Sequence, residues 1–278
     1  MTSALISAAE LKATFSDPQR VIVDCRHDLR LTDAGEDAWK QGHVPGALFM
    51  HLDRDLSGDK TGRNGRHPLP SPEGFVRLLG ERGITPRHRV VAYDDAGGMY
   101  AARLWWMLRW VGHRDVSVLD GGLQAWIAAG GAIDTTVHTL PPATYPLAAI
   151  EPVFDADAVR ANLEGGDRLL VDARAPDRFR GENETLDPVG GHIPGALNRF
   201  FKLNLGEDGR FKPADVLRAE WRELIGGRDP ATLVMQCGSG VTACHNLLAL
   251  EVAGLHGARL YPGSWSEWCS DPARPMAR

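Results

Sequence analysis

The chain has 278 residues, of which 43% are hydrophobic and 24% are charged, and its formal net charge is −5. This length favours two domains, and the composition is that of a globular protein. The acidic balance argues against a nucleic-acid partner or a polybasic membrane surface, and no window approaches the ~20 apolar residues of a membrane span.

The first six residues lack a basic region followed by a long apolar core, so we expect no secretory signal. The chain has four cysteines, too few for a disulfide scaffold in a protein of this length. We therefore expect a cytoplasmic protein. The cysteines are Cys25, Cys237, Cys244 and Cys269.

The first half of the chain alternates helices and strands. Ser7 and Glu10 form the pattern of a capping box, which predicts a helix start. Apolar runs then predict strands at residues 20–24, 90–93 and 115–119, and helices at about 99–111 and 123–129, the last closed by Gly130 and Gly131.

The second half follows the same plan. Asp155 opens a predicted helix, residues 168–172 and 232–236 are predicted strands, and residues 243–252 form a predicted helix. Strands that alternate with helices indicate an α/β fold, in which a mainly parallel sheet is flanked by helices on both faces.

Three segments recur in the same order, at offsets between 142 and 149 residues. They are Asp24-Cys25-Arg26 with Asp172-Ala173-Arg174, Gly42 to Ala47 with Gly191 to Ala196, and Asp120 to Trp126 with Pro262 to Trp268. We infer two copies of one domain, residues 1–138 and 152–278, joined by a proline-rich linker at residues 139–151. His43 and His192 in the second segment pair are expected to serve structural turns.

A cysteine lies at the carboxyl end of the last predicted strand. Cys237 begins a loop that contains Gly238 and Gly240 and leads into a helix. Ligands of parallel sheets sit beyond these strand ends, and loop N–H groups together with the helix dipole favour an anion there. The Cys237 thiol is therefore expected to lose its proton easily and to act as a nucleophile.

These features together resemble the rhodanese superfamily in its tandem-domain form. The resemblance rests on the paired His-Val/Ile-Pro-Gly-Ala segments, the segment from Tyr261 to Trp268, and the single cysteine loop. It implies two rhodanese-like domains, of which the second is catalytic and the first is not. Matching residues 90–93 to residues 233–236 places Asp94 opposite Cys237, or Asp95 if the match slips by one residue.

The resemblance implies a sulfurtransferase without metal or cofactor. The Cys237 thiolate would take a sulfur atom from a small anionic donor and become a persulfide. A thiol such as thioredoxin or a low-molecular-weight thiol, or cyanide in the test tube, would then remove the outer sulfur. The resemblance assigns the anionic group of the donor to Arg178, whose guanidinium suits a carboxylate or sulfonate. The loop residues assigned to the charged sulfur include Gly238, Gly240, Val241 and Thr242.

A proton relay is implied by the same resemblance. Ser239 matches a serine that assists proton transfer, and His67 and Asp53 look like a pair from the first domain that reaches this serine. Such a relay has the usual order of a base oriented by a third group.

The donor is left open between two compounds. The loop from Cys237 to Ala243 resembles that of 3-mercaptopyruvate sulfurtransferases, whereas thiosulfate enzymes carry Arg-Lys at the positions of Gly238 and Ser239. The mercaptopyruvate enzymes also carry a second arginine before the Gly-His-Ile-Pro-Gly turn. Residues 182–189 contain no arginine here, and this acidic stretch is expected to repel a carboxylate unless Arg180 compensates.

Other functions are less favoured. A related phosphatase would need arginine at the sixth position after the cysteine, which is Ala243. A Cys–His hydrolase could use His67 as its base, although nothing in the pattern requires this. Zinc is disfavoured because Cys237, Cys244 and His245 have poor spacing for a tetrahedral site. A non-enzymatic persulfide carrier or binding module is disfavoured because Cys237 and its loop are intact, and failure to load sulfur from any donor would favour the binding module.

Overall fold

The structure of the protein is a computed structural model that describes residues 3–148 and 150–278. Met1 and Thr2, which the sequence analysis assigned to the first domain, and Ala149, assigned to the linker, lie outside the described residues. The chain divides into two compact units. The first comprises Met1–Gly58, Leu69–Glu151 and Glu207–Arg210, and the second comprises Asp59–Pro68, Pro152–Gly206 and Phe211–Arg278.

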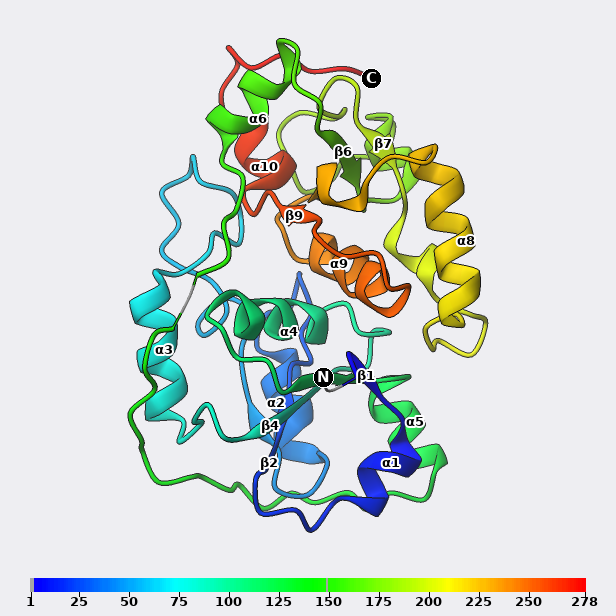
Figure 1. The fold of residues 1–278 in the computed structure, drawn as a ribbon. Helices are drawn as coiled ribbons and strands as arrows, with labels where there is room; N and C mark the ends of the chain where they lie inside the picture. Colours follow the sequence, from blue (N-terminus) through cyan, green and yellow to red (C-terminus); the bar gives the residue numbers. More distant parts are fainter. Residues whose placement is uncertain (1–2, 149) are drawn as a thin grey trace. The chain divides into compact units, whose positions relative to one another are not determined.

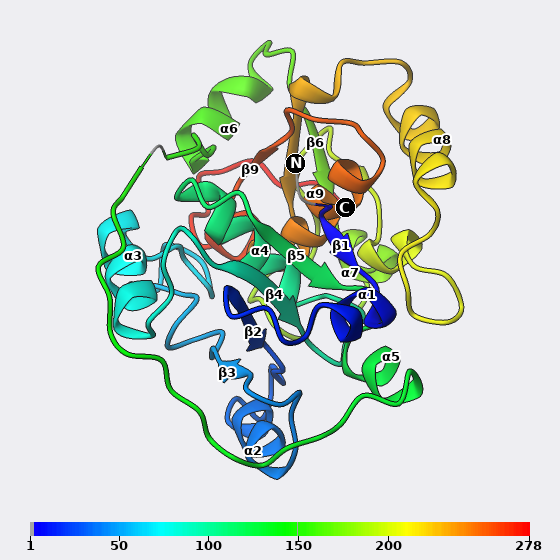
Figure 2. The same ribbon diagram turned by 60° about the horizontal axis from the view of Figure 1, so that its bottom comes forward.

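The first unit contains a five-stranded sheet in which every neighbouring pair is parallel. Figure 2 shows these strands side by side. Their order is β1 (Leu5–Ile6), β5 (Val116–Leu119), β4 (Arg89–Tyr93), β2 (Arg20–Asp24) and β3 (Leu48–Phe49). The helices are α1 (Ala8–Ala13), α2 (Ala34–Gln41), α3 (Pro72–Glu81), α4 (Ala101–Trp110) and α5 (Gly122–Ala128).

Alternating side chains of this sheet pack against helices on both faces. Ile22 and Val91 join Leu11 of α1 and Trp126 of α5 in one hydrophobic cluster. Helix α4 contributes no residue to that cluster and packs against β4 and β5 from the other face. Successive residues of a strand point to opposite faces, so strands that are apolar throughout require cover on both sides.

The second unit repeats this plan on a smaller sheet, and Figure 1 shows its elements. The parallel strands follow the order β7 (Leu197–Asn198), β6 (Leu169–Asp172), β8 (Leu233–Gln236) and β9 (Arg259–Leu260). The helices are α6 (Ala156–Leu163), α7 (Pro176–Phe179), α8 (Ala214–Ile225), α9 (Thr242–Val252) and α10 (Ser264–Trp268), with short 3-10 turns η1 (Phe201–Asn204) and η2 (Pro230–Thr232). Helices α6 and α10 share a core cluster with β6 and β8, while α9 packs against β8, β9 and α8.

The predicted α/β fold with two similar parallel-sheet domains is confirmed. The capping box is present, because the Ser7 side chain accepts the N–H of Glu10 while the Glu10 carboxylate accepts that of Ser7. Helix α4 begins at Ala101, two residues later than predicted, because the N–H groups of Tyr100 and Ala101 are directed to the Asp94 carboxylate.

The two turn histidines are packed structural residues. His43 is buried, with its Nδ1 2.6 Å from the carbonyl oxygen of Trp39, whose ring stacks on the imidazole. The ring of His192 stacks on Phe179, with centroids 3.8 Å apart, and its Nδ1 lies 2.9 Å from the carbonyl oxygen of that residue. Both imidazoles therefore hold the chain before a Pro-Gly turn.

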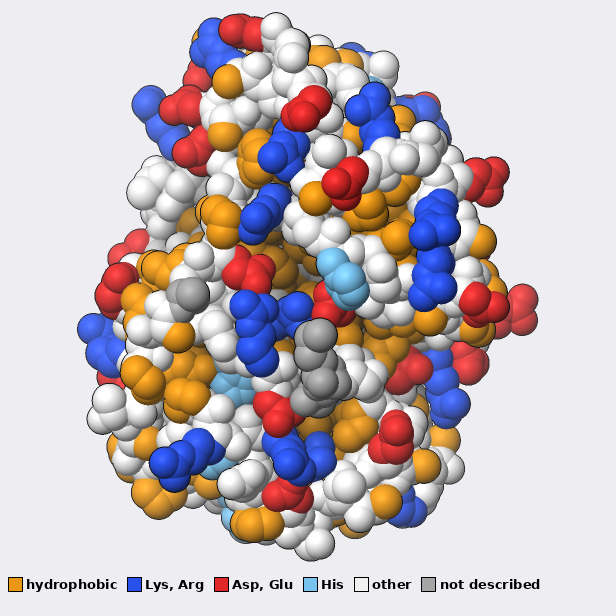
Figure 3. Space-filling model, viewed as in Figure 1, with side chains coloured by type: hydrophobic (Ala, Val, Ile, Leu, Met, Phe, Trp, Pro, Cys, Tyr) orange, Lys and Arg blue, Asp and Glu red, His pale blue; other side chains and the backbone are white. Residues whose placement is uncertain are grey.

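The surface carries mixed charge. Figure 3 shows basic and acidic side chains interspersed over the face in view. In the described parts of the chain, every helix is too short or too polar to span a lipid bilayer. Residues 139–148 contain no helix or strand, and the N–H of Ala143 donates to the carbonyl oxygen of Gly80 in the first unit.

Candidate active site

Cys237 lies at the carboxyl end of β8, an interior strand between β6 and β9. The residue is 2% exposed, and helix α9 begins at Thr242 after the loop that contains Gly238, Ser239, Gly240 and Val241. Parallel strands of a sheet end at the same edge, so the loops after β6, β8 and β9 all reach this place. A nucleophile here can be contacted by side chains from three segments.

The loop turns a backbone N–H toward the sulfur. The N–H of Gly240 donates to Cys237 Sγ at 3.1 Å. Gly240 has φ +77°, and a Cβ atom there would lie 2.3 Å from the carbonyl oxygen of Pro262, so both the backbone angle and the space require glycine. An N–H donated to sulfur at the start of a helix stabilises negative charge on that sulfur.

Two residues after β9, Ser264 and Trp265, form hydrogen bonds with the backbone of Cys237. The hydroxyl oxygen of Ser264 accepts the N–H of Cys237 at 3.0 Å, and the N–H of Trp265 donates to the carbonyl oxygen of Cys237. Ser264 is the one residue other than glycine with positive φ among those that the structure describes. This strained conformation is associated with functional sites, and here it accompanies the hydrogen bond from the N–H of Cys237 to the hydroxyl oxygen.

The first unit has Asp94 at the corresponding place. Strand β4 pairs Tyr93 with Asp24, as β8 pairs Gln236 with Asp172, and Asp94 and Cys237 come next. The alignment without a slip is therefore the correct one. The Asp94 carboxylate accepts the N–H groups of Ala96, Gly98, Tyr100 and Ala101 at 2.7–2.9 Å. The loop after this strand thus binds a built-in anion in the first unit, and the same kind of loop surrounds a thiol in the second.

Ser239 and His67 are brought together in the second unit. The Nδ1 of His67 lies 2.8 Å from Ser239 Oγ, and both residues are buried. His67 belongs to the segment Asp59–Pro68, which packs with the second unit although it precedes most of the first in sequence. Asp53 belongs to the first unit, where its Oδ2 lies 3.7 Å from His27 Nε2. The pairing of Asp53 with His67 stays a prediction.

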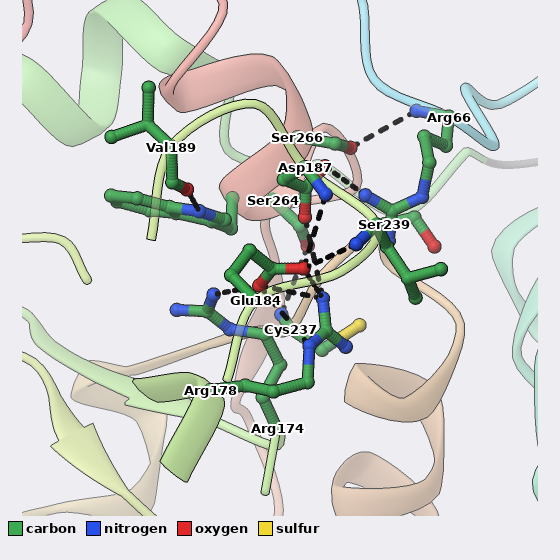
Figure 4. A network of polar contacts seen from close by, with 12 residues as sticks. Arg66, Arg174, Arg178, Glu184, Asp187, Val189, Cys237, Ser239, Ser264 and Ser266 are labelled. Atoms are coloured by element: carbon green, nitrogen blue, oxygen red, sulfur yellow. Dashed lines mark hydrogen bonds and ion pairs between the residues drawn. The ribbon is translucent and has the colours of Figure 1, made fainter. Parts of the chain in front are cut away.

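Three arginines lie near the cysteine loop, and Figure 4 shows all of them, Arg66, Arg174 and Arg178. A Cβ atom on Gly238 would lie 2.8 Å from Arg66 Nη2, 3.6 Å from Arg178 Nη2 and 3.7 Å from Arg174 Cδ. Arg174 also pairs with Asp172 at 2.7 Å, as Arg26 pairs with Asp24 in the first unit. Arg174 is thus part of the common framework, and its Nη1 also lies 3.6 Å from Glu184.

The acidic stretch contains partners of the arginines. Glu184 and Asp187 bind the arginines, and repulsion of a donor carboxylate by residues 182–189 stays a prediction. Glu184 accepts from Arg178 Nη2 at 2.7 Å, and Asp187 binds Arg66 through one oxygen and lies 3.4 Å from Arg178 Nη2 through the other. Arg180 does not compensate in this way, since it pairs with exposed Glu182.

The pKa values of these two acids shift in opposite directions. Burial would raise the pKa of the Glu184 carboxyl, but hydrogen bonds from Arg178 and from the N–H groups of Leu186 and Asp187 hold it below its ordinary value. Burial raises the pKa of Asp187 despite the opposing charge of Arg66. At Asp187 burial outweighs the charges of Arg66 and Arg178, and the neighbouring Glu184 charge raises its pKa further.

Sequence reasoning did not identify Arg66, Glu184 or Asp187 as a group. Arg66 lies next to His67 in sequence, which was the available signal for it. The two acids were visible only as part of a charged stretch, because a sequence does not show which charges are partnered.

One cluster outside this site has the composition of a metal site. His27, His51 and Asp53 each offer one atom, and these atoms lie within 4.8 Å of one another. His51 Nδ1, however, accepts the backbone N–H groups of Asp53 and Arg54. A neutral imidazole with an accepting Nδ1 carries its proton on Nε2, which then cannot coordinate a metal. The cluster therefore does not fit a metal ion.

Comparison with known proteins decides the family. The model of the rhodanese-like domain matches residues 7–129 and again residues 155–271. The chain belongs to the rhodanese-like family. Both matches fall on the repeats recognised in the sequence, so the tandem form is confirmed.

Relatives span the whole chain. A Pseudomonas aeruginosa protein described as a "probable 3-mercaptopyruvate sulfurtransferase" is 47% identical over 100% of this chain and 99% of its own length. Human 3-mercaptopyruvate sulfurtransferase is 37% identical over 86% of this chain and 84% of its own, and bovine thiosulfate sulfurtransferase is 38% identical over 81% and 77%. The solved structure of SseA from Escherichia coli, a 3-mercaptopyruvate sulfotransferase by its description, has a TM-score of 0.80 at 32% identity and covers 95% of this chain and 99% of its own.

These matches make the protein a tandem rhodanese sulfurtransferase. The relatives include enzymes named for either of two donors, so the donor used by this chain is a separate question.

Proposed function

We propose that this sulfurtransferase takes sulfur from 3-mercaptopyruvate onto Cys237 and passes it to a thiol. The observation that carries the proposal is the N–H of Gly240 at 3.1 Å from Cys237 Sγ, in a loop that borders two guanidinium groups. A thiolate is the form of cysteine that attacks sulfur, and the N–H of Gly240 is the donor that we assign to its sulfur.

The first half-reaction forms an S–S bond and breaks a C–S bond. The Cys237 thiolate attacks the donor sulfur, and the electron pair of the breaking bond stays on the three-carbon fragment as the enolate of pyruvate. A proton then converts this enolate to pyruvate. Ser239, hydrogen-bonded to His67 at 2.8 Å, is the group that we assign to this proton transfer.

Binding of the donor is assigned to Arg178 and the loop. The guanidinium of Arg178 forms a fork suited to a carboxylate, and the remaining N–H groups from Gly238 to Thr242 belong to the turn that would surround the outer sulfur. In the second half-reaction a thiol such as thioredoxin or a small thiol, or cyanide, takes the outer sulfur and regenerates the Cys237 thiolate.

The two copies divide the work in this proposal. Residues 152–278 form the catalytic domain, and residues 1–138, which carry Asp94 in place of the nucleophile, form a non-catalytic domain joined by residues 139–151. No two of the four cysteines form a disulfide, which suits a reducing compartment and supports a cytoplasmic location.

The test is the mass of the enzyme after incubation with donor. We expect 3-mercaptopyruvate to add one sulfur, about 32 Da, as a persulfide on Cys237. Cys237→Ser should gain no mass and lose turnover, whereas Cys269→Ser, which changes a buried thiol outside the loop, should behave as the wild type. Sulfur located on another cysteine, or turnover by Cys237→Ser, would refute the proposal.

Thiosulfate is the second candidate donor, because the arginines beside Gly238 could bind its sulfonate. Parallel rates with both donors, with the same acceptor, decide between them.

A further inference from the structure

The donor-binding arginines are already paired inside the protein. Arg66 and Arg178 flank the loop of Cys237, and their side chains are 27% and 20% exposed. The two acids that bind them, Glu184 and Asp187, are far more buried, with side chains 4% and 2% exposed. The arginines are therefore the more exposed members of these ion pairs, and the carboxylates are the buried members.

The pairing balances charge within the site. Arg174 and Asp172 form a pair that recurs in the first unit as Arg26 and Asp24, so this pair belongs to the framework. Arg174 Nη1 also lies 3.6 Å from Glu184, so Glu184 is shared between Arg174 and Arg178. With the charges of Arg174 and Asp172 balanced, the cations Arg66 and Arg178 remain against the anions Glu184 and Asp187. Asp187 connects the cations, because one of its oxygens binds Arg66 and the other lies 3.4 Å from Arg178. Glu184 binds Arg178 through both oxygens.

Two candidate donors differ in charge. 3-Mercaptopyruvate carries one carboxylate, whereas thiosulfate carries two negative charges. A single carboxylate can share the outward N–H groups of the guanidiniums at small electrostatic cost. The second negative charge of thiosulfate finds both arginines already paired. It is also repelled by the carboxylates of Glu184 and Asp187, which lie a few ångströms from the arginines.

We propose that Glu184 and Asp187 are specificity-determining residues that restrict this site to singly charged donors. The inference rests on the proposed function, since it assumes that the donor binds beside Cys237 and Arg178. The acids act through the arginines and do not take part in the chemistry.

Neutral variants test this proposal. Glu184→Gln and Asp187→Asn keep the shape of each side chain and remove its charge. We expect the ratio of kcat/KM for thiosulfate to kcat/KM for 3-mercaptopyruvate to rise about tenfold in each, because one unit charge at this distance in a partly solvated site is worth about that factor. Glu182→Gln is the matched control, since Glu182 lies in the same segment but pairs with exposed Arg180, and its ratio should not change.

A binding readout separates charge from loss of structure. Sulfate and pyruvate, a dianion and a monoanion, are compared as competitive inhibitors of each variant. We expect the inhibition constant of sulfate to fall more than that of pyruvate in Glu184→Gln and Asp187→Asn. Equal changes for both donors and both inhibitors would overturn the proposal, because a merely structural role affects all anions alike. Should one variant fail to fold, the other still carries the test.

Failure of this inference is distinguishable from failure of the proposed function. If Cys237 still gains one sulfur from 3-mercaptopyruvate while the donor ratio stays constant, the persulfide mechanism holds and the role of the two acids is wrong.

Discussion

The imidazole Nδ1 of His67 lies 2.8 Å from the hydroxyl oxygen of Ser239, two residues after Cys237. The backbone around His67 is anchored in the same unit, since the N–H of Arg66 donates to Ser266 Oγ at 3.0 Å and Ser270 Oγ donates to the carbonyl oxygen of Arg63. This anchoring gives the imidazole a defined position beside the cysteine loop.

The His67–Ser239 pair predicts a donor-dependent effect. Release of pyruvate from 3-mercaptopyruvate requires a proton at carbon, whereas sulfite leaves thiosulfate without one. We expect His67→Asn and Ser239→Ala to lower kcat with 3-mercaptopyruvate about 100-fold and to change the rate with thiosulfate much less. Steady-state kinetics with both donors measures this, and an equal loss with both would contradict the role in proton transfer.

Arg178 is predicted to act in donor binding. Arg178→Ala should raise the KM for 3-mercaptopyruvate roughly 10- to 100-fold, because a hydrogen bond between charged groups contributes about 1.5–3 kcal/mol. The KM for the acceptor thiol should change little. Arg180→Ala is the control, since Arg180 is two residues away and its guanidinium pairs with exposed Glu182. Similar increases in both KM values would argue against a role confined to the donor.

Asp94 is predicted to stabilise the first unit. In Asp94→Asn one oxygen is lost, so two of the four N–H groups that now bind the carboxylate would face an NH2 group. We expect the free energy of unfolding to fall by about 3 kcal/mol, the cost of leaving two buried donors unsatisfied. Urea denaturation measures this change. Asp95→Asn, which changes an exposed neighbouring residue, should have a free energy of unfolding close to that of the wild type. An Asp94→Asn variant as stable as the wild type would show that the carboxylate is dispensable.

Glu184 predicts a dependence of stability on pH. Its pKa in the folded protein lies below the ordinary value of 4.5. The stability that it contributes is therefore fully present above about pH 4.5 and is lost as the pH falls through the folded pKa. Urea unfolding measures the free energy of unfolding from pH 6 down to about 3.5. Over this range the free energy of unfolding should fall less in Glu184→Gln than in the wild type.

Glu182 needs to be separated from this effect, because Arg180 also lowers its pKa. The Glu182–Arg180 pair is exposed, and about 0.5 M salt screens it while leaving a buried pair largely intact. In that salt the free energy of unfolding of Glu182→Gln should depend on pH as that of the wild type does. A Glu184→Gln curve parallel to the wild type would mean that its pairing with Arg178 is not formed.

The sequence alone determined the fold and the duplication, and it indicated Cys237 as the candidate nucleophile. Strands such as 20–24 and 233–236 are short apolar runs, Gly240 supplies a backbone angle that other residues avoid, and capping residues mark helix starts. These signals are local, because they depend on the conformational preferences and polarity of neighbouring residues. The identity of the residue opposite Cys237 needed the pairing of β4 with β2, since a slip of one residue left the sequence match ambiguous.

Only the tertiary structure decided the surroundings of Cys237. The segment that carries Arg66 and His67 packs with the second unit, and contacts such as Arg66 with Asp187 or His67 with Ser239 join residues more than a hundred positions apart. Whether a charged residue repels a ligand or neutralises a neighbour depends on its partner in space, and chain order carries no record of that partner. Glu184 and Asp187 therefore looked like a repulsive stretch in the sequence, and in the folded protein they bind the arginines of the site.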